Sequence, residues 1–257
     1  MDHPLDGCRA KLDRAHAHLR TLDAQIPAFL DSKPHVYRGE IDREASRYRV
    51  RVYIRRQPPL RWSAIVGDLV HNLRSALDHL VWQLVILNGS TPGDNHQFPI
   101  LSSPQPKKFA RLTAEVSPLA AAVIERVQPY NGGDGVDAHT LTALRELSNE
   151  DKHRVILPTA TAIPVDALKK RGSFELMAAR DVGEIEGMEV VGDKPLKNGE
   201  EVMSAAIEIT GPNPEIQMKG DLPFDVAFGK HMVSMTGLAQ VNGSVYAVFE
   251  LLKPFFD

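Results

Sequence analysis

The sequence of 257 residues contains one cysteine, few aromatic residues and no long apolar run. A single cysteine, Cys8, cannot form an internal disulfide or supply a cysteine-rich zinc site, and we expect a packed thiol rather than a nucleophile. No apolar stretch approaches the roughly 20 residues that a membrane-spanning helix needs. The first residues lack the basic and apolar regions of a signal peptide. These absences predict a cytoplasmic protein with no membrane partner.

The chain also lacks a strong net charge, since 30 Lys and Arg residues face 33 Asp and Glu residues, a formal charge of −3. Such a balance gives no overall attraction to nucleic acid, so any such binding must use a local patch. A hydrophobic fraction of 43% and a charged fraction of 25% are ordinary for a globular protein. We therefore expect a globular chain that is neither disordered nor a coiled coil.

The first 158 residues show mainly helical periodicity. Apolar residues recur at helical spacing in residues 6–30, 62–87, 118–127 and 138–147. Pro27 and Pro34 are expected to close the first of these helices, and a proline-rich loop is expected after the second. Between Ser46 and Arg56 the period changes to two, which predicts a half-buried strand paired with a shorter one before it. Residues 1–158 thus read as a helical bundle with a hairpin inserted at 34–56.

Residues 159–257 change in character. Apolar alternation predicts antiparallel strands within residues 174–178, 188–191, 202–209 and 216–228. A helix is expected to close the chain from Met232 to Leu252. The predicted fold is therefore α+β: a helical bundle with a β-hairpin, then an antiparallel β-rich part and a C-terminal helix. The two parts are either separate domains or one domain.

The predicted helix at residues 62–87 has an unusual polar face. One face carries five leucines and predicts a core contact. The opposite face has neither Lys nor Glu, which usually fill a solvated helix face. It carries instead Asp68, His71, Asn72, Arg74, Ser75, Asp78, His79 and Trp82. These residue types transfer protons or bind phosphate and metal, and a tryptophan among them is typical of a pocket. The alternative is a polar network that fixes neighbouring helices.

The spacing of Arg74 and His79 resembles the R-x(4–6)-H motif of HEPN-domain proteins. These are helical bundles that include metal-independent ribonucleases, in which Arg and His act on the scissile RNA phosphate at a dimer interface. A polar residue usually follows the Arg, as Ser75 does here. The resemblance implies that Arg74 holds phosphate, that His79 transfers a proton and that Asp78 or His71 orients them. The resemblance implies that no cofactor is needed. It also implies that the partners are RNA or a nucleotide and a second copy of the chain.

One feature departs from that motif. On an uninterrupted helix the Arg74 and His79 side chains lie about 140° apart. Both reach one phosphate only if the helix bends or if a second subunit contributes.

A longer stretch, residues 67–82, is similar to a recurring segment of uncharacterised bacterial proteins. So is the short stretch from Asn149 to Arg154. This resemblance brings no known activity, but it implies that the two segments belong together, with Lys152 and His153 facing the polar face. We accordingly expect the ligand contacts to come from Asp68, Asn72, Ser75, Trp82, Asn149, Lys152 and His153.

Arginines alternate along the predicted strand, at Arg47, Arg49 and Arg51. Such a row suits a nucleic-acid backbone, which makes these residues candidates for substrate binding. The alternative is a solvated strand face whose cations pair with neighbouring acids such as Glu40 and Asp42.

Three functions remain open at this point. The preferred one is binding of RNA or a nucleotide, with metal-independent ribonuclease action as an addition. The second is a non-catalytic ligand-binding or dimerisation module. The third is a metal-dependent hydrolase using Asp68, His71 and His153, although the usual zinc and di-iron spacings are absent.

Overall fold

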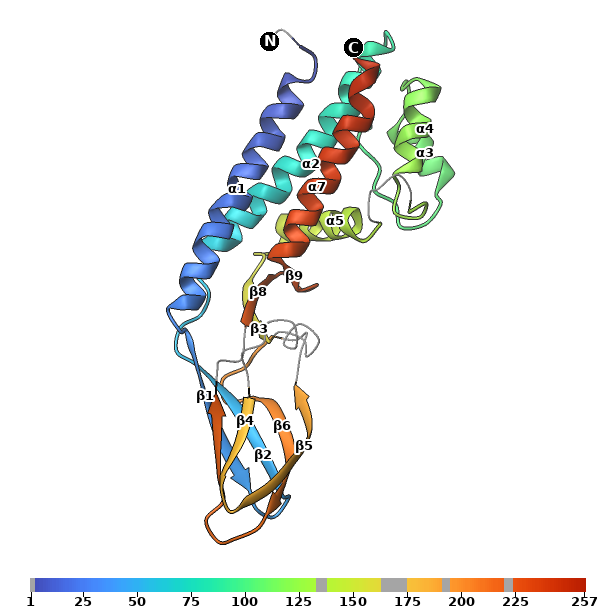
Figure 1. The fold of residues 1–257 in the computed structure, drawn as a ribbon. Helices are drawn as coiled ribbons and strands as arrows, with labels where there is room; N and C mark the ends of the chain where they lie inside the picture. Colours follow the sequence, from blue (N-terminus) through green and yellow to red (C-terminus); the bar gives the residue numbers. More distant parts are fainter. Residues whose placement is uncertain (1–2, 133–137, 163–174, 191–194, 220–223) are drawn as a thin grey trace. The chain divides into compact units, whose positions relative to one another are not determined.

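A computed structural model describes residues 3–132, 138–162, 175–190, 195–219 and 224–257. It confirms the predicted α+β fold with a C-terminal helix (Figure 1). The chain divides into two compact units. A helical unit comprises residues 1–24, 60–157 and 228–257, and a β unit comprises residues 25–59 and 158–227. The predicted hairpin thus groups with the later strands, not with the helices that flank it in sequence.

The helical unit is built from the first part of α1 (Asp6–Asp31) and from α2 (Arg61–Leu87), α3 (Pro106–Leu112), α4 (Pro118–Arg126), α5 (Ala138–His153), α7 (Met235–Leu252) and a short 3₁₀ turn (Lys253–Phe255). Helix α2 contacts α5 and α7, and α5 runs transverse to both in Figure 1. The expected loop after α2 contains the helix α3, and α1 continues through Pro27 instead of ending there. None of the described helices is long and apolar enough to cross a membrane.

The core of this unit follows the predicted periodicity. The five leucines on one face of α2 are at most 2% exposed, and the apolar positions of α5 and α7 are buried with them. Burial of one such leucine side chain stabilises the fold by about 1.5–3 kcal/mol. These core leucines are Leu69, Leu73, Leu77, Leu80 and Leu84. Because they fill the core, the opposite polar face of α2 is left for other contacts.

The β unit contains a four-stranded antiparallel sheet in the order β1-β2-β6-β5. Its strands are β1 (His35–Asp42), β2 (Arg47–Ile54), β5 (Val182–Val190) and β6 (Glu201–Ile209). Strand β4 (Glu175–Arg180) pairs with β7 (Glu215–Lys219), and β3 (Pro158–Ala162) with β8 (Phe224–Phe228). Strand β9 (Val233–Ser234) precedes α7. Parts of the expected strands, residues 174, 191 and 220–223, lie outside the described residues.

The hairpin joins this sheet because one face of β2 is apolar. Tyr48, Val50 and Val52 are at most 5% exposed and pack with residues of β6. Gly39 of β1 lies beneath the ring of Tyr48, and a β-carbon at that position would overlap the ring. The absence of a side chain at Gly39 therefore lets Tyr48 lie flat on the hairpin.

We predict that Gly39→Ala lowers the free energy of unfolding by about 1–3 kcal/mol, because the added methyl must displace a buried ring. Chemical denaturation measures the change. Gly93→Ala is the matched control, since a β-carbon there meets nothing within 4 Å. Equal effects of the two substitutions would contradict this packing.

Candidate phosphate-binding site

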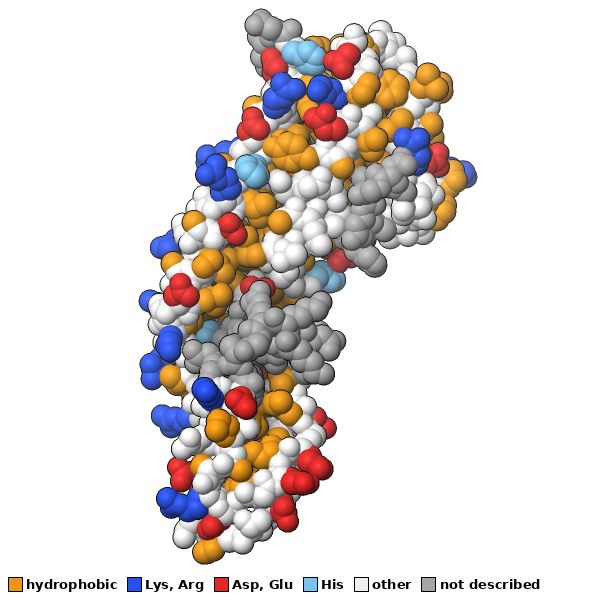
Figure 2. All heavy atoms as spheres, in the orientation of Figure 1, with side chains coloured by type: hydrophobic (Ala, Val, Ile, Leu, Met, Phe, Trp, Pro, Cys, Tyr) orange, Lys and Arg blue, Asp and Glu red, His pale blue; other side chains and the backbone are white. Residues whose placement is uncertain are grey.

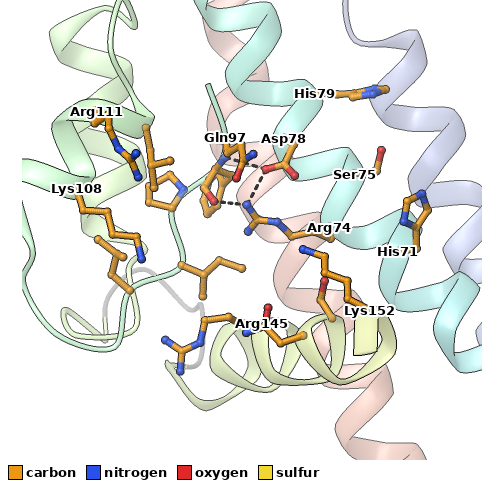
Figure 3. Close-up of a pocket in the computed structure, with 17 residues that line it drawn as sticks. His71, Arg74, Ser75, Asp78, His79, Gln97, Lys108, Arg111, Arg145 and Lys152 are labelled. Carbon is orange, nitrogen blue, oxygen red and sulfur yellow. Dashed lines mark hydrogen bonds and ion pairs between the residues drawn. The ribbon is translucent and has the colours of Figure 1, made fainter. Parts of the chain in front are cut away.

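The polar face of α2 lines a cavity of about 590 Å³ within the helical unit. Figure 3 shows its walls, which come from α2, α3, α5 and the irregular segment after α2. Of the residues proposed from sequence, the cavity is lined by His71, Arg74, Ser75, Asp78, His79, Asn149 and Lys152. The two sequence segments that were expected to belong together therefore meet at one cavity.

A charged hydrogen-bond network fixes the centre of this cavity. Arg74 Nη2 donates to Asp78 Oδ1 at 2.7 Å and to the carbonyl oxygen of Phe98 at 2.6 Å. The same Asp78 oxygen accepts the backbone N–H of Phe98 at 2.9 Å (Figure 3). The side chains of Arg74 and Asp78 are 19% and 30% exposed, so water weakens this pair only in part. These bonds hold residues 97–101 against α2.

The other side of that segment is held by Gln128, which is 1% exposed. Its amide donates to the carbonyl of Pro99 at 2.9 Å and accepts the N–H of Leu101 at 3.0 Å. The ring of Phe98 is fully buried and anchors the segment in the core. A segment without regular structure thus forms a fixed wall of the cavity, because side chains satisfy its backbone groups.

Helices α3 and α5 add cations that sequence reasoning missed: Lys108 and Arg111 come from α3, and Arg145 from α5. Within the described part of the chain, Lys108, Arg111 and Lys152 form no ion pair, whereas Arg145 meets Glu146 at 3.4 Å. No local pattern marks these residues, because only the fold brings α3 and α5 to the same cavity.

The cavity is strongly basic. Five lining residues are cations, Arg74, Lys108, Arg111, Arg145 and Lys152, and Asp78 supplies the one carboxyl group among the lining residues that the structure describes. Figure 3 shows the long cationic side chains around a common hollow. Like charges around a partly enclosed space favour an anion there. A chain with a slightly negative total charge therefore carries a local concentration of positive charge.

Burial raises the pKa of Asp78, while Arg74, the Phe98 N–H and Lys152 act in the opposite direction. The net rise means that the cavity holds this proton more tightly than water does. Protonation of Asp78 removes the one carboxylate that opposes an anion in the described lining.

A close approach of α5 to α2 places Lys152 at the cavity. A β-carbon at Gly67 would lie 2.5 Å from Asp151 Oδ1, so a glycine leaves room for this neighbour. Burial raises the pKa of Asp151, and the charge of Asp68 adds to the rise, whereas His71 lowers it. Gly67, which begins the recurring segment, thus has a packing role where the two helices approach each other.

The remaining candidates lie elsewhere. Asp68 is mostly exposed and lies 4.0 Å from His18, while Asn72 donates to the backbone oxygen of Asp68 at 2.7 Å. His153 ends α5 and is not among the lining residues that the structure describes. Trp82 lines a neighbouring hollow.

The arginines of β2 belong to the β unit and are paired with acids. Arg49 meets Asp42 at 3.0 Å and Glu201 at 3.2 Å, and Arg51 meets Glu40 at 2.6 Å. Arg47 lies 3.3 Å from Glu189 of β5. Figure 2 shows acidic side chains along the edge of the unit where β5 lies. These ion pairs match the alternative interpretation of the strand, a solvated face whose cations pair with neighbouring acids.

The positions of the described residues do not support the metal-dependent alternative. No group of three His, Cys, Asp or Glu side chains among them is arranged to hold a metal ion. Asp68, His71 and His153 are all described, and they do not form such a group.

Comparisons with protein-family models, curated proteins and solved structures find no match to this chain. The geometry of the cavity is therefore the basis for its functional interpretation.

The raised pKa of Asp78 gives a test of this geometry. Because the folded chain binds this proton more tightly than the unfolded chain, the contribution of Asp78 to stability is full below its ordinary pKa of 3.8 and is lost as the pH rises through the folded pKa. The free energy of unfolding of wild type, measured relative to that of Asp78→Asn, should therefore fall as the pH rises from about 4 to about 8. A difference that stays flat or grows with pH would contradict the predicted direction of the pKa.

Proposed function

We propose that the cavity binds phosphate groups of RNA or of a nucleotide. The observation that carries this proposal is the set of five cations around one hollow with a single carboxyl group in its described lining. In addition to Arg74, the cavity is lined by the guanidinium groups of Arg111 and Arg145. Each of these groups can hold two phosphate oxygens with parallel N–H donors. Lys108 and Lys152 add point charges.

Neutral donors in the same cavity complete the chemistry of a phosphate site. Ser75, Ser148 and Asn149 carry hydroxyl or amide groups that can donate to phosphate oxygens. The Arg74 guanidinium already bonds Asp78 and Phe98 through Nη2, so it is held in place before a ligand arrives. A cation fixed in advance loses less freedom on binding, which raises affinity.

The resemblance to HEPN-domain proteins favours RNA among phosphate-bearing ligands, since the Arg74 and His79 motif lies on a wall of this cavity. Ribonuclease action is the second candidate. It is favoured by the presence of His71 and His79 in the same lining, because a neutral imidazole can take the proton of an attacking 2′-hydroxyl.

The helix limits which histidine can act beside Arg74. Helix α2 is continuous from Arg61 to Leu87, so His71 lies about 60° and His79 about 140° around the axis from Arg74. Figure 3 shows the His79 ring directed away from the Arg74 guanidinium. The figure also shows the His71 ring on the side of α2 away from that guanidinium. In a ribonuclease, a histidine of a second copy would therefore serve the phosphate that Arg74 holds.

Binding is tested with a fluorescent single-stranded oligoribonucleotide in EDTA. We predict that Lys108→Ala and Lys152→Ala each lower affinity about tenfold and reduce the slope of log K against log salt by about 0.7. Lys107→Ala is the matched control, since this exposed neighbour on α3 does not line the cavity. Equal losses in the Lys107 and Lys108 variants, or no binding by wild type at low salt, would contradict the proposal.

Cleavage is tested separately with a mixed RNA pool in EDTA. The ribonuclease alternative predicts cleavage by wild type and its loss in folded Arg74→Ala, together with a loss of at least about 100-fold in His71→Ala or His79→Ala. Circular dichroism checks that each variant is folded. Binding without cleavage at any protein concentration, or equal cleavage by all chains, would leave phosphate binding as the function.

A further inference from the structure

A second hollow, of about 750 Å³, adjoins the basic cavity along α2. It lies between the beginning of α1 and the last part of α2, and its lining includes Gly7, Cys8, His79 and Trp82. His79 lines both hollows, so the two spaces meet at this residue. A ligand that occupies both hollows would therefore pass beside His79 on α2.

The walls of the second hollow differ from those of the first. Cys8 is 1% exposed, and burial raises the pKa of its thiol to about 12, so it presents a neutral, apolar surface. Gly7 has no side chain, and a β-carbon there would be in ordinary contact with His79 Nδ1 at 3.7 Å. Apart from its two histidines, His3 and His79, the described lining has no ionisable cation.

Trp82 is the largest side chain among the described residues that line this hollow. Its relative exposure is 42%, whereas the other tryptophan, Trp62, is 1% exposed in the core. An exposed indole offers a flat π surface on which a nucleobase can stack. Trp82 lies eight residues after Arg74, which corresponds to about 12 Å along the helix axis. A strand of a few nucleotides covers that separation, and a lone phosphate does not.

We infer that the second hollow is a base-stacking subsite: Trp82 stacks a nucleobase of single-stranded RNA whose phosphates lie in the basic cavity. This inference rests on the proposed phosphate binding and adds the part of the ligand that distinguishes RNA from other polyanions. Stacking on an aromatic side chain accepts any base, so the subsite selects single-stranded nucleic acid without selecting its sequence.

Two probes with equal numbers of phosphates separate the two subsites. One is a short oligoribonucleotide, and the other is its abasic analogue. The oligoribonucleotide should bind about tenfold more tightly. It should also quench the fluorescence of the exposed Trp82, which the abasic strand should not. Trp82→Ala should remove the difference in affinity and leave abasic binding unchanged. Trp82→Phe should keep the difference and lose the quenching, and as a surface substitution each should leave the chain folded.

The outcomes distinguish the inference from the proposal on which it rests. Equal binding of both probes by wild type and by Trp82→Ala would overturn the base subsite and leave phosphate binding intact. Failure of both probes to bind would overturn both. If Trp82→Ala converts a dimer into a monomer in sedimentation and does not change the difference between the probes, the indole belongs to a subunit interface and the inference is wrong.

Discussion

The candidate site depends on one hydrogen-bonded contact, in which a single oxygen of Asp78 accepts from both Arg74 and the Phe98 N–H. Arg74 closes the contact by donating to the Phe98 carbonyl. The carboxylate is partly buried, so loss of the Arg74 donor would leave it with the Phe98 N–H alone, at a cost of about 1–3 kcal/mol. This contact ties an irregular segment to a core helix, and the segment in turn forms the wall that encloses the cations.

The same contact separates two roles within one polar helix face. Asp78 and one side of the Arg74 guanidinium are used for structure, which is the polar network considered as an alternative to a functional site. The cations of α3 and α5 have no comparable structural use among the described residues, apart from the contacts of Arg145 with Glu146 and with the Ser102 hydroxyl. Repulsion among these cations destabilises the chain, and an anion in the cavity would relieve it. The structural and functional interpretations of the polar face therefore apply to different atoms of the same site.

Much of the fold follows from periodicity, and less of the site does. The leucine stripe of α2 and the alternation from Tyr48 to Val52 predict their own burial, because each pattern repeats locally. The union of the hairpin with β6 depends on a pairing across some 150 residues, which no local pattern encodes. The polar face of α2 is likewise visible in the sequence. Lys108, Arg111 and Arg145 are not, since ordinary surface cations become part of a site only through helix packing.

The most direct test of the central claim is a nuclear magnetic resonance titration of arginine side-chain Nε–H signals with a short oligoribonucleotide. The account predicts that the signals of Arg74, Arg111 and Arg145 shift together with added RNA. Those of Arg47, Arg49 and Arg51, paired with acids in the β unit, should stay in place within the same spectrum. Shifts confined to the β-unit arginines, or no shift in either set, would contradict a phosphate-binding cavity on α2.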